Sequence, residues 1–377
     1  MIAAIRSAVS VNESILYVAF ELGKREWKLA MTSGFGAAPW VQTIASGDLE
    51  AVGRVVAKAR TRFALRAGAR VMSCYEAGRD GFWIHRALQR LGLENHVVDS
   101  SSIEVNRRAR RMKTDRIDAI KLVRLLVRVG AGDRGAWAEV RVPPVEIEAA
   151  RHSSRERSAL TQERTRLRNQ IGSWLTLHGC RVTTRQRQPA EWWTEVRDWA
   201  EAPLPGPVQA RLARASARLT LVEDQLATIA AQQAAITAAA AAASPRARLV
   251  QLKGVATTSA AVLVEEGLVW RQFRNRREVG GLLGFAPAKY DSGDSSRDQG
   301  ITRAGNTRLR TALVQLAWGW VRWQPHSALT RWYQARFGHG QRARKIGIVA
   351  LARKLLVALW RYATHGITPV GAIVKTA

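Results

Sequence analysis

Residues spaced by alternating steps of four and three place the strongest constraint on the fold of this chain. They are Val208, Leu212, Ala215, Leu219, Val222, Leu226, Ile229, Gln233 and Ile236. This spacing is a heptad seam of about four repeats, which indicates a long helix packed lengthwise against another helix.

A second long helix is predicted just upstream, over residues 151–178. Its apolar residues are Leu160, Leu167, Ile171 and Trp174, and they stand among many arginines. Two such helices indicate an antiparallel coiled-coil hairpin, which could form within one chain or between protomers. The alternative is an alanine-rich helix packed on its own domain.

The first third of the chain alternates strand and helix patterns. Predicted strands cover residues 15–22, 26–33, 40–45, 70–77 and 95–100, and predicted helices cover 49–65, 81–92 and 114–127. Three strands followed by helix, strand, helix, strand and helix predict an α/β domain with a mixed sheet. This is the element order of an RNase H-like domain, although order alone fixes no function.

A chain of 377 residues exceeds one ordinary core, so we expect three domains. Their predicted ranges are 1–134 (α/β), 135–245 (helical coiled coil) and 246–377 (mostly helical). The last domain opens with a Gly between two helical patterns, which resembles a helix-hairpin-helix that could bind phosphate, or is a plain packing turn. Tryptophans at 318, 320, 323, 332 and 360 lie at core spacing, with base stacking as the alternative.

Charge narrows the class of partner. The chain carries 59 Lys and Arg against 30 Asp and Glu, a formal net charge of +29. Such an excess favours a polyanion, and the sequence has no basic amphipathic anchor beside an apolar span, so nucleic acid is favoured over a membrane surface. Cys74 and Cys180 belong to no CxxC motif, which argues against structural zinc. The start of the chain reads as no signal peptide, and we expect a cytoplasmic protein.

Carboxylates stand where a nucleic-acid enzyme would need divalent metal. Glu21 closes the first predicted strand, Glu76 ends the fourth, and Asp115 and Asp118 share one face at the start of a helix. In an RNase H-like sheet these elements meet at one edge, where oxygen ligands hold Mg²⁺. The alternative for Asp115 is an ordinary first-turn acid favoured by the helix dipole.

The segment "KYDSGDSSRDQGITRAGN" combines hydroxyls, an acid and arginines. Ser292 lies between Asp291 and Gly293, with Arg297 and Arg303 close behind. A serine in this setting could be a nucleophile whose phosphoryl product the arginines stabilise, with Ser295 and Ser296 nearly as suitable by composition. The alternative is a solvated Ser/Gly/Asp loop.

Six blocks together resemble the insertion-sequence-110 transposases, the DEDD family. They are "YVAFELGKREWKLA", "CYEAGRDGFWIHRAL", "RRMKTDRIDAIKL", "LKGVATTSAAVLVEE", "EVGGLLGFAPAKYDSGDSSRDQGITRAGNTRLRTAL" and "ARKLLVALW", in the family's order across nearly the whole chain. The resemblance implies a RuvC-like N-terminal domain, a coiled-coil middle and a C-terminal transposase domain.

The resemblance also implies roles and partners. Glu21, Glu76, Asp115 and Asp118 would hold Mg²⁺ and Ser292 would be the nucleophile, although the family's first acid is normally Asp rather than Glu. The partners would be double-stranded donor and target DNA and a structured bridge RNA that pairs with both, bound by a homo-oligomer, a dimer or tetramer, with the site shared between protomers. Candidate nucleic-acid contacts are Arg107, Arg108, Arg110, Arg111, Lys113, Arg297, Arg303, Arg308, Arg310, Arg342, Arg344 and Lys345.

Two other functions remain open from the sequence. A RuvC-like junction endonuclease would hydrolyse DNA with water and would need no serine. A non-catalytic nucleic-acid-binding protein would need neither the acids nor the serine, and the Glu at position 21 is the one sign in its favour.

Overall fold

The computed structural model describes residues 15–103, 114–183, 191–285, 287–292, 295–302 and 305–375. Contacts within the chain divide it into two compact units, Met1–Val142 and Pro143–Ala377. The three predicted domains, with boundaries at 134 and 245, stay a prediction that this division does not test.

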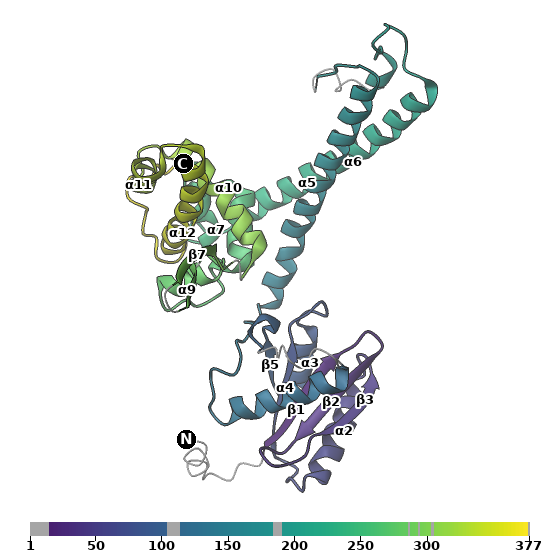
Figure 1. Cartoon of the computed structure of the whole chain (residues 1–377), viewed down its shortest axis with the longest axis vertical. Helices are drawn as coiled ribbons and strands as arrows, with labels where there is room; N and C mark the ends of the chain where they lie inside the picture. The colour runs from purple at the N-terminus through teal and green to yellow at the C-terminus, as the bar shows by residue number, and fades with distance from the viewer. Residues whose placement is uncertain are drawn as a thin grey trace. The chain divides into compact units, whose positions relative to one another are not determined.

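Unit 1 is built on a five-stranded mixed sheet (Figure 1). Its strands are β1 (Ile15–Leu22), β2 (Glu26–Thr32), β3 (Trp40–Ala45), β4 (Arg70–Glu76) and β5 (Glu94–Val98). The spatial order is β3-β2-β1-β4-β5, with β1–β2 and β2–β3 antiparallel and β1–β4 and β4–β5 parallel. The predicted strands and their order along the chain are therefore confirmed, and so is the mixed α/β class.

Helices cover both faces of this sheet. The helices are α2 (Leu49–Arg62), α3 (Trp83–Arg90) and α4 (Asp115–Gly130), and a 3₁₀ turn, η1, spans Ser100–Ser102. Even-numbered residues of β1, such as Val18, pack with α2 and α3, whereas odd-numbered ones, such as Ala19, pack with α4. Because strand side chains alternate between faces, this division tells which acids can face α4.

Unit 2 begins with two long helices, α5 (Val145–Leu177) and α6 (Gly206–Ala239) (Figure 1). They run antiparallel, since Gln233 bonds to Ser153 near one end and Arg218 pairs with Glu163 towards the other. The heptad seam lies largely at their contact. Its buried members are Leu212, Ala215, Val222, Leu226, Ile229 and Gln233. Ile236 is 57% exposed, so the seam ends before the position that the spacing predicted.

The rest of unit 2 is a helical bundle with one small hairpin. Its elements are α7 (Pro245–Gln251), α8 (Thr257–Leu263), η5 (Val264–Leu268), α9 (Arg276–Gly281), β6 (Pro287–Ser292), β7 (Ser295–Ile301), α10 (Thr307–Trp323), α11 (Ala328–Phe337) and α12 (Gln341–His365). The 3₁₀ turn η4 (Trp192–Thr194) packs instead against α5 and α6. Buried residues of α7, α8, α10 and α12 form its core. Among the residues that the structure describes, no helix is long and apolar enough to span a membrane.

Candidate active site

Glu21 and Glu76 stand side by side at the carboxyl ends of two neighbouring strands. The parallel pairing of β1 with β4 matches Phe20 to Tyr75, so the next position along brings Glu21 beside Glu76. Neighbouring strands lie about 4.8 Å apart. Glu21 also pairs with Lys28 on its other side. Two acids and a lysine therefore form one row across the sheet.

This row faces the side of the sheet that α4 covers. Glu21 has the parity of Tyr17 and Ala19, and Glu76 has that of Cys74, all of which pack in the α4 core. Burial raises the pKa of the Cys74 thiol well above its usual value, and the nearby Glu76 carboxylate adds to that rise. The charge of Glu76 is thus felt on the α4 side of β4.

The first turn of α4 points to the same end of the sheet. A Cβ added at Gly130, the last residue of α4, would lie 2.6 Å from the ring of Tyr17, so the helix ends over the start of β1. From Tyr17 to Glu21 the strand rises about 13 Å. From Gly130 back to Asp118 the helix spans about 18 Å. The helix start therefore lies near the strand ends that carry the two glutamates.

Asp115 and Asp118 are held in place by the cap of α4. The Thr114 hydroxyl accepts a hydrogen bond from the Ile117 amide at 3.4 Å, which fixes where the helix begins. Asp115 is exposed, whereas the Asp118 side chain is 20% exposed and lies 3.3 Å from the Lys121 ammonium. Both acids are first-turn residues, as the helix dipole favours, and this position does not by itself distinguish a structural from a metal-binding role.

The four acids share one end of one face, but their side chains do not form a ready metal centre. Across residues 15–103, 114–183 and the later described segments, no three His, Cys, Asp or Glu side chains lie close enough together to hold a metal ion. The donor set itself, carboxylate oxygens on two rigid strands and a helix, is of the kind that fits Mg²⁺. Mg²⁺ binding by these acids stays a prediction.

Ser292 ends a β-strand rather than lying in a loop, which corrects the loop expected from composition. Strands β6 and β7 pair antiparallel, with Ser292 opposite Ser295 and Asp291 opposite Ser296. Ser292 is thus the last described residue before the two-residue connection at positions 293 and 294. The structure describes only the backbone of Ser292 and of Arg297, so which hydroxyl reacts stays a prediction.

The segment that follows β7 is bonded to the segment that precedes β6, so the two flanks of the hairpin are held together. The Thr302 hydroxyl donates to the Gly284 carbonyl at 3.2 Å, and the Asn306 amide donates to the Leu282 carbonyl at 3.0 Å. Gly305 makes this closeness possible, because a Cβ there would lie 2.5 Å from the same carbonyl oxygen and its φ is +116°. The backbone that presents Ser292 therefore starts from a fixed base.

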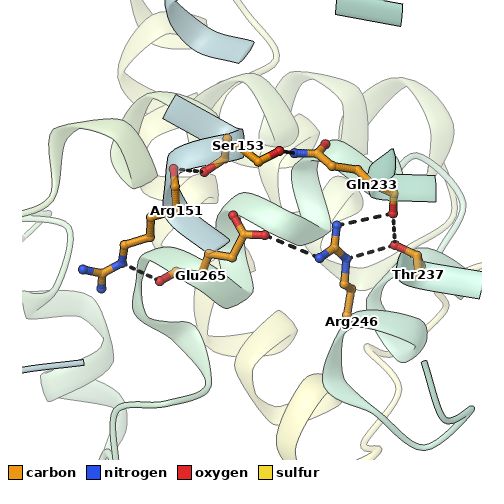
Figure 2. A network of polar contacts seen from close by, with 7 residues as sticks. Arg151, Ser153, Gln233, Thr237, Arg246 and Glu265 are labelled. Carbon is orange, nitrogen blue, oxygen red and sulfur yellow. Dashed lines mark hydrogen bonds and ion pairs between the residues drawn. The ribbon is translucent and has the colours of Figure 1, made fainter. Parts of the chain in front are cut away.

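A buried polar network ties the long helices α5 and α6 to α7 and to Glu265 of η5 (Figure 2). Arg246 on α7 lies 3.4 Å from the Glu265 carboxylate and donates to the Thr237 hydroxyl on α6 at 2.9 Å. Arg151 on α5 donates to the Glu265 carbonyl at 2.9 Å. Burial raises the pKa of Glu265, and its hydrogen bond with Ser154 and the charge of Arg246 act in the opposite direction.

The neighbouring Glu266 extends the network to the hairpin base. Its carboxylate accepts from the Asn306 amide nitrogen at 2.7 Å and lies 3.4 Å from the Arg155 guanidinium of α5. Asn306 in turn caps α10 by accepting from the Leu309 amide at 3.1 Å. Both glutamates lie in the π-helical turn η5, beside Gly267 with φ +144°. They fix α5, η5 and α10 relative to one another.

Apart from Arg297, whose side chain the structure does not describe, the predicted nucleic-acid contacts divide into three groups. Arg107, Arg108, Arg110, Arg111, Lys113 and Arg303 lie outside the described residues. Arg310 donates to the Leu283 carbonyl at 2.9 Å and Arg344 to the Gly338 carbonyl at 3.1 Å, so each guanidinium has a bond inside the fold. Arg308, Arg342 and Lys345 are exposed.

The glycine turn after α7 packs inside the domain. The Lys253 amide donates to the Ile373 carbonyl at 3.0 Å, and the Lys253 carbonyl accepts from the Gln324 side chain at 2.8 Å. These bonds are consistent with the packing alternative, and phosphate binding by the other amides of the turn stays a prediction. Among the tryptophans, Trp320 is fully buried, whereas Trp318 and Trp323 are 44% and 46% exposed.

Sequence reasoning missed Glu265 and Glu266 and the hairpin. The two acids stand in "LVEE" at the end of a helical pattern, where burial cannot be read without knowing their partners. The hairpin had a readable signal, because a two-residue Gly-Asp connection between strand-like runs favours a tight turn.

Comparisons with known proteins match this chain to one family of proteins. Residues 246–332, which hold η5 and the serine hairpin, match the model of the transposase IS116/IS110/IS902 family. A Sinorhizobium fredii protein named as transposase y4rJ is 39% identical over 98% of this chain and 97% of its own length. A Pseudomonas aeruginosa protein named as a family 20 transposase is 30% identical over 61% of this chain and 68% of its own. The transposase for insertion sequence element IS1328 of Yersinia enterocolitica is 28% identical over 32% of this chain and 36% of its own.

Proposed function

Because this chain belongs to the IS116/IS110/IS902 family of transposases, we propose that it recombines the DNA of an insertion sequence by serine attack on a phosphodiester. The observation that carries the proposal is the hairpin of β6 and β7. Within the family-matched segment, Ser292 stands at the end of β6, on a backbone whose base is held by Thr302 and Asn306.

In the proposed reaction the Ser292 oxygen attacks phosphorus and displaces one deoxyribose oxygen. A phosphoserine ester forms as the phosphodiester bond breaks, and the serine proton ends on the released deoxyribose hydroxyl, so atoms balance without a co-reactant. A hydroxyl of another strand then attacks the phosphoserine and restores a phosphodiester. Since each bond broken is replaced by a similar ester, no ATP is required.

Glu21, Glu76, Asp115 and Asp118 would hold divalent metal in this proposal. Mg²⁺ bound there would neutralise charge on the scissile phosphate and lower the barrier to attack. The protein's own contribution is to place two carboxylates on adjacent strand ends and two on the start of α4. Glu21 keeps the charge of the usual aspartate with one more methylene, which shifts the carboxylate by about one bond length.

The partners follow from charge and from the family resemblance. A net charge of +29 suits a protein that holds donor DNA, target DNA and a structured bridge RNA, with sequence choice made by base pairing. We also propose a homo-oligomer, a dimer or a tetramer, in which the serine of one protomer and the acids of another act on one phosphate.

A covalent-adduct assay tests the proposal. Purified protein is incubated with labelled DNA carrying the element's junction, its transcribed flanking RNA and Mg²⁺, and is then run on a denaturing gel. The wild-type protein should give a protein–DNA adduct that Ser292→Ala loses and that Ser295→Ala and Ser296→Ala retain. Asp115→Asn with Asp118→Asn should lose both adduct and recombinant product while still binding DNA.

Each rival function has its own outcome in this assay. A junction endonuclease predicts that Ser292→Ala still cleaves and that no adduct appears. A non-catalytic binding protein predicts that neither set of substitutions changes anything but affinity. Omitting the RNA tests guidance separately, since an unguided transposase would recombine equally well without it.

A further inference from the structure

A large groove opens on α12, which follows the β6–β7 hairpin in the chain, whereas η5 precedes it. It has a volume of about 1100 Å³ and is lined by α9, α11, α12, Phe285 and the last residues of β7. Phe285 precedes β6, and Gly300 and Ile301 end β7, so the groove reaches the base of the hairpin that carries Ser292.

The groove is basic. Its charged lining residues are Arg276, Arg277, Lys345, Arg353, Lys354 and Arg361, and no acidic residue whose side chain the structure describes lines it. None of the six forms an ion pair with a residue whose side chain the structure describes. Arg353 is turned partly inward, donating to the Phe285 carbonyl at 3.4 Å. Uncompensated cations around a cavity attract a polyanion.

The floor of the groove is apolar and follows the helix. Along α12, positions 345, 349, 353, 357 and 361 form one row four residues apart, in which cations alternate with valines. A second row, at 346, 350, 354 and 358, holds Ile346, Lys354 and two alanines. Cations of the first row recur every eight residues, about 12 Å apart, over a total of about 24 Å.

Trp332 gives the floor an aromatic face. The Lys354 ammonium lies 4.6 Å from its ring centroid, and the Phe337 ring packs edge-on against it with centroids 5.6 Å apart. Trp332 is only partly buried and lines the groove. An aromatic ring beside a lysine can receive both the face of a base and the phosphate next to it.

This combination separates single-stranded from double-stranded ligands. A duplex hides its base faces, so it would contact the cations and leave Trp332, Ile346 and the valines uncovered. A strand with unstacked bases covers the apolar floor and neutralises the cations together. We propose that this groove binds a single-stranded segment of nucleic acid, from DNA or RNA, beside the serine hairpin. The site takes its ligand class from the proposed function but does not depend on serine chemistry.

Binding of the full-length protein to labelled oligonucleotides of about twelve nucleotides, by fluorescence anisotropy, tests the groove. The probes are oligodeoxythymidine, oligouridine and a duplex of the same length. Lys354→Gln with Arg361→Gln should weaken single-strand binding about tenfold and reduce the salt slope by about 1.4, the value for two lost contacts. The control is Arg331→Gln with Arg336→Gln, which removes the same charge from exposed positions of α11 that do not line the groove.

Trp332→Leu separates stacking from charge. It should weaken single-strand binding with no change in salt slope and no change in duplex binding, in protein whose circular dichroism is unchanged. A preference for either single-stranded probe supports the site and identifies its source.

Three results would overturn the proposal. The first is that the Lys354→Gln, Arg361→Gln protein binds single strands as tightly as the Arg331→Gln, Arg336→Gln protein. The second is that its duplex binding falls as much as its single-strand binding. Competition by polyglutamate as effective as that by the oligonucleotides is the third. The binding assay does not depend on adduct formation by Ser292, so the groove can be tested even if the serine mechanism is wrong.

Discussion

Removing Arg246 isolates the contribution of the buried network to unit 2. The Arg246 side chain is 12% exposed and the Glu265 side chain 5% exposed, so both charges are largely removed from water. In the Arg246→Ala variant the Glu265 carboxylate keeps its burial and loses the nearest cation. The carboxylate oxygen Oε2 already has no hydrogen-bond partner among the described residues, so the hydrogen bond with Ser154 and the charge of Arg151 are what remain to offset the loss.

The expected cost is set by leaving a buried charge alone. Breaking a buried ion pair from one side costs about 3 kcal/mol, or about 150-fold in an opening equilibrium. The hydrogen bond from Arg246 to Thr237 is also lost, but Thr237 retains its bond to the Gln233 carbonyl at 2.7 Å. The main term is therefore the unpaired Glu265.

Arg218→Ala is the matched control. Arg218 pairs with Glu163 across the same two long helices at 3.0 Å, but these side chains are 62% and 32% exposed. Solvent screening limits such a pair to less than about 1 kcal/mol. Both variants replace one arginine of unit 2 by alanine, so they differ chiefly in burial.

Amide hydrogen exchange in peptides covering residues 257–268 measures the opening directly, without assuming that the whole chain unfolds in one step. Exchange there should speed up about 150-fold in Arg246→Ala and less than about fivefold in Arg218→Ala. Equal acceleration in the two variants would refute the reasoning.

Acidity gives a second check on the same variant. Without the charge of Arg246 the pKa of Glu265 rises further above its unfolded value, so the folded variant binds a proton more tightly than the unfolded chain. Its stability deficit relative to wild type should therefore shrink as pH falls through that raised pKa. A deficit that stays constant down to acidic pH would mean that Glu265 is not its source.

Two further predictions concern other parts of the fold. The hydrogen bond that protonated His96 donates to the Glu139 carboxylate at 2.7 Å is the main cause of a raised pKa at His96. This stabilisation of unit 1 is present below the ordinary histidine pKa and is lost as pH rises through the raised value. In Glu139→Gln the NMR titration midpoint of His96 should fall. In Gly347→Ala the new Cβ would lie 2.3 Å from the Phe337 ring, so the melting temperature should drop. Gly172→Ala in α5 has nothing within 4 Å of the new Cβ, so its melting temperature should rise, because alanine favours the helix by up to about 1 kcal/mol. Equal shifts in both would contradict the packing.

Local patterns predicted most of unit 1. The strands at 15–22 and 40–45 were predicted with their observed bounds, because a short apolar or alternating run between turn residues indicates a strand. The sequence predicted only that Glu21 and Glu76 lie at the same edge of the sheet. It did not predict that they occupy neighbouring positions. Their neighbouring register depends on the β1–β4 pairing, which joins segments 55 positions apart and leaves no mark in either one.

Burial of charge and the ends of long helices were harder to predict. Glu265 and Glu266 look like ordinary helix acids until α5, α7 and Asn306 supply their cations and hydrogen bonds. Ile236 continues the heptad spacing of α6 but is 57% exposed. Heptad spacing predicts only where a partner helix could pack.

The anchoring of α5 and α6 also has a mechanical meaning. The network around Glu265 holds one end of each helix, near Arg151 of α5 and Thr237 of α6. From Arg151 to Leu177 helix α5 extends about 39 Å. For a helix of that length, a tilt of about 5° about its held end moves the far tip by about 3 Å. Glu266 joins the held end of α5 to the cap of α10. A force applied at the far tip therefore produces a smaller displacement, with a larger force, next to Asn306.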